Sequence, residues 1–304
     1  MLVRLSNIAS DYHIYNQHDV RSQDEALHHM LTKMLVYIFI QKESRMGAKQ
    51  FFDAIQNVLN RIAETQYETI SHVAQLGADS IANDRLIVLF GSGHSFLPTM
   101  DTYPRIGSFP GWLPIHELST SYLAAVQGNQ ALRQALYLEK IEGFGRVVLD
   151  NYRLNAKDVM IIISNSGVNP MGIDVALSAR EQGLKTVAIT SLAHSQGSKS
   201  RHSTGKRLFE VCDLVIDTCV PQGDAQITIP GFPHKVASAS TIAGCIIMQS
   251  LVAEVAQNLA ERGITLPVFP SHNVGMTEDE HTTLDVMVDK WYEEHARRTA
   301  HIYK

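Results

Sequence analysis

Two hydrophobic periods alternate along the chain. From Met46 onward apolar residues recur at helical spacing, which predicts a pair of helices over about 49–82. Short apolar runs then predict five strands, at 85–90, 112–116, 158–163, 185–190 and 213–217. Helical patterns lie between the strands, and a long one over 240–262 follows the fifth. Because proline cannot donate to a sheet ladder, Pro114 places the second strand at a sheet edge.

Strands that are apolar throughout and alternate with helices are typical of an α/β protein. We therefore predict a three-layer, doubly wound fold with a parallel five-stranded sheet and N-terminal helices. Residues 46–275 form the main domain in this interpretation, and the charged segment 276–304 is a helical tail that faces solvent or serves as a dimer arm.

The first 45 residues have a different pattern from the rest of the chain. They carry scattered His, Gln and Asn without an amphipathic period, which predicts an irregular N-terminal extension. Our hypothesis is that this segment is not native and that translation starts at Met46. The alternative is a genuine N-terminal helix that packs on a partner.

Hydroxyl-bearing and glycine-rich turns follow the predicted strands, where ligands bind in doubly wound folds. Gly91-Ser92-Gly93-His94-Ser95 follows the first strand, Ser164-Asn165-Ser166-Gly167 follows the third, and Ser238-Ala239-Ser240-Thr241 opens the last helix. Glycine lets backbone approach a ligand, and a helix N-terminus attracts an anion. These turns predict one phosphate site held by neutral donors from Ser92, Gly93, Ser95, Ser164, Asn165, Ser166, Asn169, Ser240 and Thr241.

The two common nucleotide signatures do not fit these turns. A Walker A motif requires GxxxxGK[ST], which the chain lacks. A dinucleotide fingerprint requires a third glycine at position 96, which is Phe96. The turns therefore favour a phosphomonoester over a nucleotide.

The same three turns resemble those of the sugar isomerase (SIS) domain family over about residues 49–270. The chain is similar in particular to uncharacterised bacterial SIS proteins of the UPF0309 type, which share the run found here at Ser200–Leu208. The resemblance implies a flavodoxin-like SIS fold in which the serines of the first two turns surround the phosphate of a phosphosugar. Asn169 stands where the family often has a threonine. The resemblance does not decide the reaction, because SIS domains occur in isomerases, a sugar-ether lyase, amine-transfer enzymes and sensor modules.

Aldose–ketose isomerisation requires a proton-transfer group with a pKa near neutrality. Glu117 directly follows the second strand with His116 beside it, and His94 lies in the first turn, so these three are the candidate catalytic residues. A carboxylate in an apolar pocket would have a raised pKa. The alternative for Glu117 is that it caps the next helix or lies in solvent.

We therefore expect an isomerase acting on a sugar phosphate, with amino and N-acetyl sugars among the candidates. An etherase-type phosphosugar lyase and a non-catalytic sensor or regulatory module are the alternatives. The basic loop at 191–208 is either a lid over an anionic ligand or a solvated loop.

The composition of the chain limits the partners, compartments and cofactors that we expect for this protein. With 26 Lys+Arg against 31 Asp+Glu, the net charge is −5, which argues against nucleic acid as a partner. No run approaches the roughly 18 apolar residues of a membrane span. Three cysteines without CxxC spacing favour a reducing cytoplasm, and nothing predicts a metal or organic cofactor. Exposed apolar positions such as Phe51 and Phe52 predict a homodimer or homotetramer.

Overall fold

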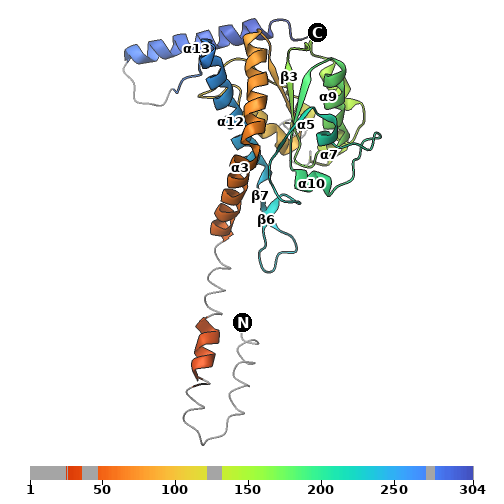
Figure 1. Cartoon of the computed structure of the whole chain (residues 1–304), viewed down its shortest axis with the longest axis vertical. Helices are drawn as coiled ribbons and strands as arrows, with labels where there is room; N and C mark the ends of the chain where they lie inside the picture. The colour runs from red at the N-terminus through yellow and green to blue at the C-terminus, as the bar shows by residue number, and fades with distance from the viewer. Residues whose placement is uncertain (1–24, 26, 36–46, 122–131, 272–277, 304) are drawn as a thin grey trace, which may run out of the picture. The chain divides into compact units, whose positions relative to one another are not determined.

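The structure is a computed structural model, and it describes residues 25, 27–35, 47–121, 132–271 and 278–303. The chain divides into two compact units. One consists of residues 1–52 with 227–235, and the other of residues 53–226 with 236–304. The second unit holds the five-stranded sheet (Figure 1).

A five-stranded parallel sheet forms the centre of the second unit, as predicted. Its strands are β1 (Ile87–Gly91), β2 (Trp112–Pro114), β3 (Val159–Ile163), β4 (Lys185–Thr190) and β5 (Leu214–Asp217). The order is β2-β1-β3-β4-β5, with Leu89 of β1 opposite Ile161 of β3. The prediction from Pro114 is confirmed, because β2 lies at the edge and pairs with β1 alone.

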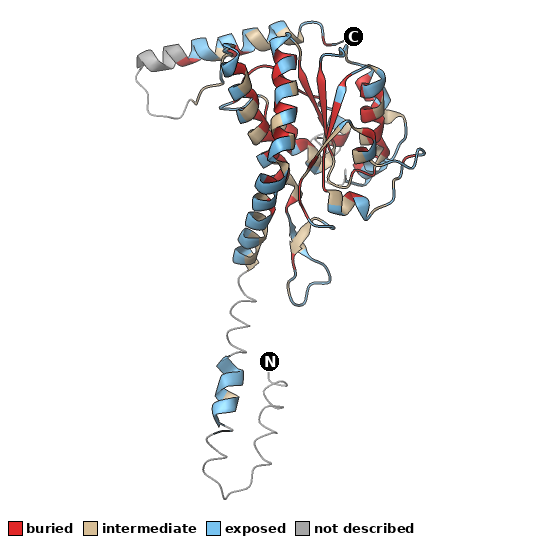
Figure 2. Ribbon diagram, viewed as in Figure 1, coloured by how far each residue is buried: buried red, intermediate tan, exposed pale blue. Residues whose placement is uncertain are grey.

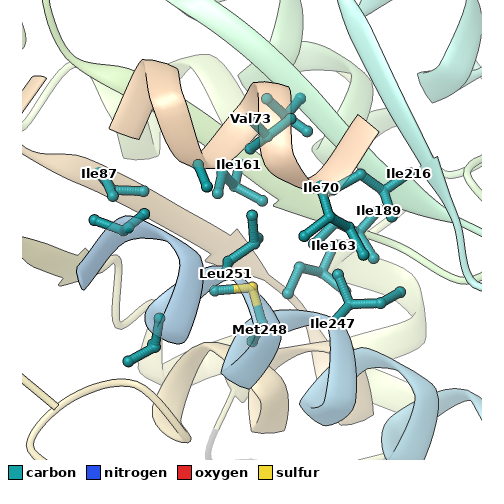
Figure 3. Packing of buried hydrophobic residues seen from close by; sticks show 14 of the residues in the cluster. Ile70, Val73, Ile87, Ile161, Ile163, Ile189, Ile216, Ile247, Met248 and Leu251 are labelled. Carbon is teal, nitrogen blue, oxygen red and sulfur yellow. The ribbon is translucent and has the colours of Figure 1, made fainter. Parts of the chain in front are cut away.

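Helices cover both faces of this sheet, which confirms the three-layer prediction. Side chains alternate between the faces along each strand. One face packs on α3 (Gly47–Ala82) and α12 (Ser240–Glu261), and the other on α8 (Phe144–Leu149), α9 (Pro170–Glu181) and α11 (Leu208–Val211). Figure 3 shows Val73 of α3, Ile161 of β3 and Leu251 of α12 meeting in the first layer. The strands β1, β2 and β3 are buried along their length, whereas most of β5 is only partly buried (Figure 2).

Short elements connect this framework. They are η2 (Gly93–Phe96), α4 (Leu97–Met100), α5 (Leu118–Ser121), α7 (Leu132–Leu138), α10 (Leu192–Gln196) and the paired strands β6 (Ala225–Ile227) and β7 (Val236–Ser238). Helical structure was expected from 120 to 152, and residues 122–131 of that region lie outside the described residues.

The N-terminal helices differ from the prediction. A single helix, α3, replaces the expected pair over 49–82. It contains no proline, and its one interior glycine, Gly77, serves close packing: an added Cβ would lie 2.7 Å from the Cδ1 atom of Ile87. Residues 27–35 of the segment expected to be irregular are helical, and the remainder of 1–45, except residue 25, lies outside the described residues.

The C-terminal segment is helical, as predicted, and one of its side chains is deeply buried. It forms α13 (Glu278–Thr299), and the indole of Trp291 is fully buried. Its Nε1 donates to the backbone oxygen of Ser108 at 3.2 Å, and its ring stacks on that of His295 with 5.4 Å between centroids. Most of the other described side chains of α13 are exposed, so one large aromatic side chain anchors an otherwise polar helix. That this helix serves as a dimer arm stays a prediction. The boundary at residue 275 stays a prediction.

Within the described part of the chain, α12 is the one helix whose length and apolar composition would suffice to cross a membrane. Its residues Ile247, Met248 and Leu251 are buried in the layer beneath the sheet (Figure 3). Burial accounts for these three side chains, whereas Ile242 and Ile246 of the same helix are exposed.

Candidate functional site

The carboxyl ends of the strands and the start of α12 surround one small hollow. Its lining residues come from the first turn, the ends of β3 and β4, the segment after β5 and the first turn of α12. They are His94, Ser95, Pro98, Ile163, Asn165, Ile189, Thr218, Ser240 and Thr241. A wider depression beside α13 is lined by residues such as Lys290 and Glu293, and it contains none of the predicted site residues.

The first turn is shaped by two glycines. A Cβ on Gly91 would lie 2.2 Å from the carbonyl oxygen of Ser95, so only glycine allows the chain to turn into η2 at this point. Gly93 has a φ of +54°, in the region that glycine favours. The amide of Ser95 donates to the carbonyl of Ser92 at 3.1 Å, which closes the turn and directs residues 94 and 95 to the hollow.

The second turn is held by hydrogen bonds of its own. The amide of Gly167 donates to the hydroxyl of Ser164 at 3.2 Å, and the carbonyl of Asn165 accepts from the amide of Ser191 at 3.1 Å. The side-chain oxygen of Asn165 is buried and has no hydrogen-bond partner among the described residues. Buried polar atoms are nearly always paired, so this amide at the edge of the hollow is a candidate ligand contact.

The start of α12 already holds a carboxylate. Asp224 accepts hydrogen bonds from the amides of Ala239 and Ser240, at 3.0 and 2.8 Å, and from the Ser240 hydroxyl at 2.7 Å. A carboxylate at this position satisfies amides that the helix itself leaves unpaired. The Ser240 hydroxyl is therefore engaged, whereas the side chain of Thr241 makes no hydrogen bond within the described part of the chain.

The remaining predicted phosphate ligands do not line the hollow. They are Ser92, Gly93, Ser164, Ser166 and Asn169. Ser164 shapes its own turn, and Ser166 is half-buried with no side-chain hydrogen bond to another described residue. Ser92 and Asn169 contact a carboxylate described below.

Of the three candidate catalytic residues, the structure brings His94 to the hollow. Glu117 accepts hydrogen bonds from the amide and the hydroxyl of Ser119, at 3.3 and 2.5 Å, and so caps α5. The His116 ring packs edge-on against Phe96, with 5.1 Å between centroids. Although more than a third of His116 is exposed, desolvation of its enclosed ring lowers the pKa of the imidazole.

Sequence reasoning missed Glu139, which follows α7 and is 9% exposed. Its Oε1 accepts from the hydroxyl of Ser92 at 2.7 Å, and its Oε2 accepts from the Nδ2 of Asn169 at 2.9 Å. The carboxylate thus joins the turns after β1 and β3. Nothing in the spacing of Glu139 marks it, because it is one of several charged residues near the end of a helical pattern.

The basic loop at 191–208 is held against α9. The Arg201 guanidinium donates to the Oδ1 of Asn169 at 2.7 Å, and the backbone amide of Arg201 donates to the carbonyl of Val168 at 2.9 Å. His202 is buried and lies beside Asp174. The loop is therefore neither wholly solvated nor detached from the second turn, because Arg201 bonds to Val168 and Asn169, which follow that turn.

The described residues contain no group of three or more His, Cys, Asp or Glu side chains arranged to hold a metal ion. That the site works without a metal or an organic cofactor stays a prediction.

Comparison with known protein families shows the class to which this protein belongs. Residues 50–191 match the family model of the SIS domain, so this is an SIS domain protein. UPF0309 proteins from Listeria monocytogenes and Lysinibacillus sphaericus are each 36% identical to it, covering 74% and 76% of this chain and 89% and 92% of the relatives. A UPF0309 protein from Streptomyces coelicolor is 35% identical over 75% of this chain and 89% of its own length. The chain belongs to the UPF0309 family of SIS domain proteins.

Among solved structures, a phosphoheptose isomerase from Neisseria gonorrhoeae is similar with 16% identity and a TM-score of 0.45, covering 71% of this chain and 98% of that one.

Proposed function

We propose that this protein binds the phosphate of a phosphorylated sugar in the hollow at the strand ends and interconverts the aldose and ketose forms of that sugar. The observation that carries the proposal is the shared hollow itself, lined by the first turn, the end of β3 and the start of α12. Membership of the SIS family supports the same ligand class.

The chemistry of the lining suits a phosphate held by neutral groups. Ser95, Thr218 and Thr241, which carry hydroxyls, line one small space together with Asn165. If the Asn165 amide turns by 180°, its two N–H donors take the place of the unpaired oxygen. Histidine is the side chain whose ordinary pKa suits proton transfer near neutral pH, so His94 is the group at the hollow that we assign to this step.

A second candidate function is a sensor that binds the sugar phosphate without turnover. One observation favours it: the carboxylate of Glu117 is used to cap α5, which leaves fewer acid–base groups at the strand ends.

A thermal-shift screen tests the binding proposal. Hexose, heptose and N-acetylhexosamine phosphates should raise the melting temperature by mass action, and the unphosphorylated sugars should not. Ser95→Ala should abolish this response, while Ser250→Ala, which alters a hydroxyl bonded to the carbonyl of Ile246 in α12, should retain it. A wild-type protein that responds to no phosphosugar, or equally to unphosphorylated sugars, would contradict the proposal.

Incubation of each hit with the protein in D2O, followed by NMR, separates the reactions. Deuterium at C1 or C2 indicates an isomerase that works by proton abstraction. Cleavage of an ether bond indicates a lyase. Binding with neither change supports the sensor function.

We also propose a homodimer or homotetramer in the cytoplasm. Large apolar side chains are exposed on α7 and α8, among them Leu132, Leu136, Tyr137 and Val147. Exposed apolar surface of this kind marks interaction sites. The three free cysteines support a reducing compartment. A monomeric mass by light scattering at micromolar concentration would contradict the oligomer.

A further inference from the structure

The Glu139 carboxylate occupies an unusual position for a binding site built from serine turns. It is almost fully buried, yet the described residues place no cationic side chain directly on it. Its two hydrogen bonds come from the hydroxyl of Ser92 and the amide of Asn169, one from each turn. Its backbone carbonyl accepts from the amide of Met171 at 3.2 Å, which fixes the residue to the first turn of α9.

Burying a carboxylate is costly unless hydrogen bonds replace its water. Ser92 and Asn169 supply those hydrogen bonds. Arg201 extends the series of hydrogen-bonded side chains by donating to the Oδ1 of Asn169 at 2.7 Å. Three hydrogen bonds thus link these four side chains. The hydroxyl of Ser92 and the amide of Asn169 are therefore committed to a carboxylate.

A phosphate dianion cannot share those donors with the carboxylate. Like charges a few ångströms apart in a partly buried site repel strongly. The hollow lined by Ser95, Asn165 and Thr241 does not include Glu139, and it offers hydroxyl groups without a carboxylate partner on Ser95 and Thr241. The anion and the carboxylate thus have separate places at the strand ends.

The carboxylate retains capacity for further hydrogen bonds. A carboxylate has about four lone-pair positions, and two are used here. Gly93 lies between Ser92 and the hollow-lining His94, and a Cβ on Gly93 would come 3.5 Å from the Glu139 Oε1. Because glycine has no side chain, residue 93 places no side-chain atom against this carboxylate oxygen.

We infer that Glu139 is a specificity-determining residue of the phosphosugar site: it accepts hydrogen bonds from sugar hydroxyls, while the phosphate lies in the adjoining hollow. Ser92 and Asn169 are positioning residues for this carboxylate and do not bind phosphate. The inference rests on the proposed phosphosugar function, and it changes the roles that the sequence predicted for Ser92 and Asn169.

The test measures dissociation constants for inorganic phosphate and for the phosphosugar that gives the largest thermal shift. Glu139→Gln and Ser92→Ala should each weaken the phosphosugar by about tenfold or more, the loss expected for a hydrogen bond to a charged group, and leave phosphate within about threefold. Glu142→Gln is the matched control, because Glu142 is an exposed carboxylate three residues away that pairs with Ser203. It should bind both probes as the wild type does.

Three outcomes would overturn the inference. Phosphate binding that tightens about tenfold in Glu139→Gln would show that the carboxylate occupies the phosphate's own donors. Phosphate binding that weakens about tenfold in Ser92→Ala would make Ser92 a phosphate ligand. Unchanged phosphosugar affinity in both variants would remove Glu139 from the site. Ser92→Ala keeps the buried carboxylate, so its affinities for phosphate and for the phosphosugar test the inference if Glu139→Gln fails to fold. A wild-type protein that binds no phosphosugar refutes the proposed function instead.

Discussion

The Nε2 of His202 lies 3.2 Å from the Oδ1 of Asp174, and both side chains are buried. The other oxygen of Asp174 accepts from the amide of Gly143 at 2.7 Å. One carboxylate thus joins α9, the basic loop and the turn before α8. This contact fixes the loop that carries Arg201, and with it the polar chain that ends at Glu139.

Removing His202 should therefore release the loop. We expect His202→Ala to lower the free energy of unfolding by about 1–3 kcal/mol, because it leaves a buried carboxylate short of one partner. Trypsin should then cut after Lys199, Arg201 or Lys206 faster than in the wild type. His234→Ala, which changes an exposed histidine, should alter neither quantity. Equal cleavage rates for wild type and His202→Ala would mean that other contacts hold the loop.

Two glycines in neighbouring helices should respond to alanine in opposite ways. A Cβ on Gly145 in α8 would lie 2.2 Å from the carbonyl oxygen of Met171 in α9, so Gly145→Ala should force the helices apart and cost about 1–3 kcal/mol or more. At Gly172 in α9 the nearest atom would be 3.8 Å away, so Gly172→Ala should stabilise by up to about 1 kcal/mol through helix propensity. Urea unfolding measures both, and similar effects would contradict the close approach of α8 and α9.

Trp291 should be the main anchor of α13. Trp291→Ala should cost about 3–5 kcal/mol, since it removes a fully buried aromatic side chain and its hydrogen bond to Ser108. Tyr67→Ala, at an aromatic residue that is 56% exposed, should cost less than about 0.5 kcal/mol. Unfolding by urea, followed by circular dichroism, compares the two. A small loss at Trp291 would show that α13 contributes little to the stability of the domain.

The ion pairs at the end of α13 should make the free energy of unfolding depend on pH in the acidic range. Hydrogen bonds from the Arg297 guanidinium hold the pKa of Asp84 below its ordinary 3.8 and that of Glu294 below its ordinary 4.5. A lowered pKa in the folded state contributes stability above the ordinary value, and this contribution is lost as the pH falls below that value.

Arg297→Gln should therefore cost about 1 kcal/mol at pH 7, a modest value because Asp84 and Arg297 are largely solvated, and progressively less as the pH falls below the ordinary pKa values of the two carboxyls. Urea unfolding midpoints of the two proteins across this range provide the measurement. A difference that stays constant from pH 7 to pH 3 would rule out these carboxylates as the cause.

Much of the fold could be predicted from local patterns. Runs such as Ile161 to Ile163 are apolar on both faces because helices cover both sides of the sheet. Such strands can therefore be recognised from the sequence without knowing which strands lie beside them. Pro114 identified an edge strand through its own chemistry. Gly91 and the serines after it marked a turn at a strand end, and residues 94 and 95 of that turn line the hollow.

Other features depend on contacts between residues far apart in the chain. Asp224 caps α12 from 16 positions before Ser240, a separation at which sequence capping rules do not apply. Glu139 meets Ser92 across 47 positions and Asn169 across 30. Trp291 is buried in a helix whose composition is polar, so its charge pattern alone predicted exposure.

The amino-acid sequence alone determined the class of fold, the order of its strands and the glycine- and serine-containing turns at the strand ends, because periodicity, proline and glycine act through local geometry. Only the tertiary structure decided which hydroxyls face the common hollow and which are committed to Glu139 or Asp224. Which hydroxyls are committed depends on the position of a carboxylate from a distant segment of the chain. Neighbours in the sequence do not determine that position.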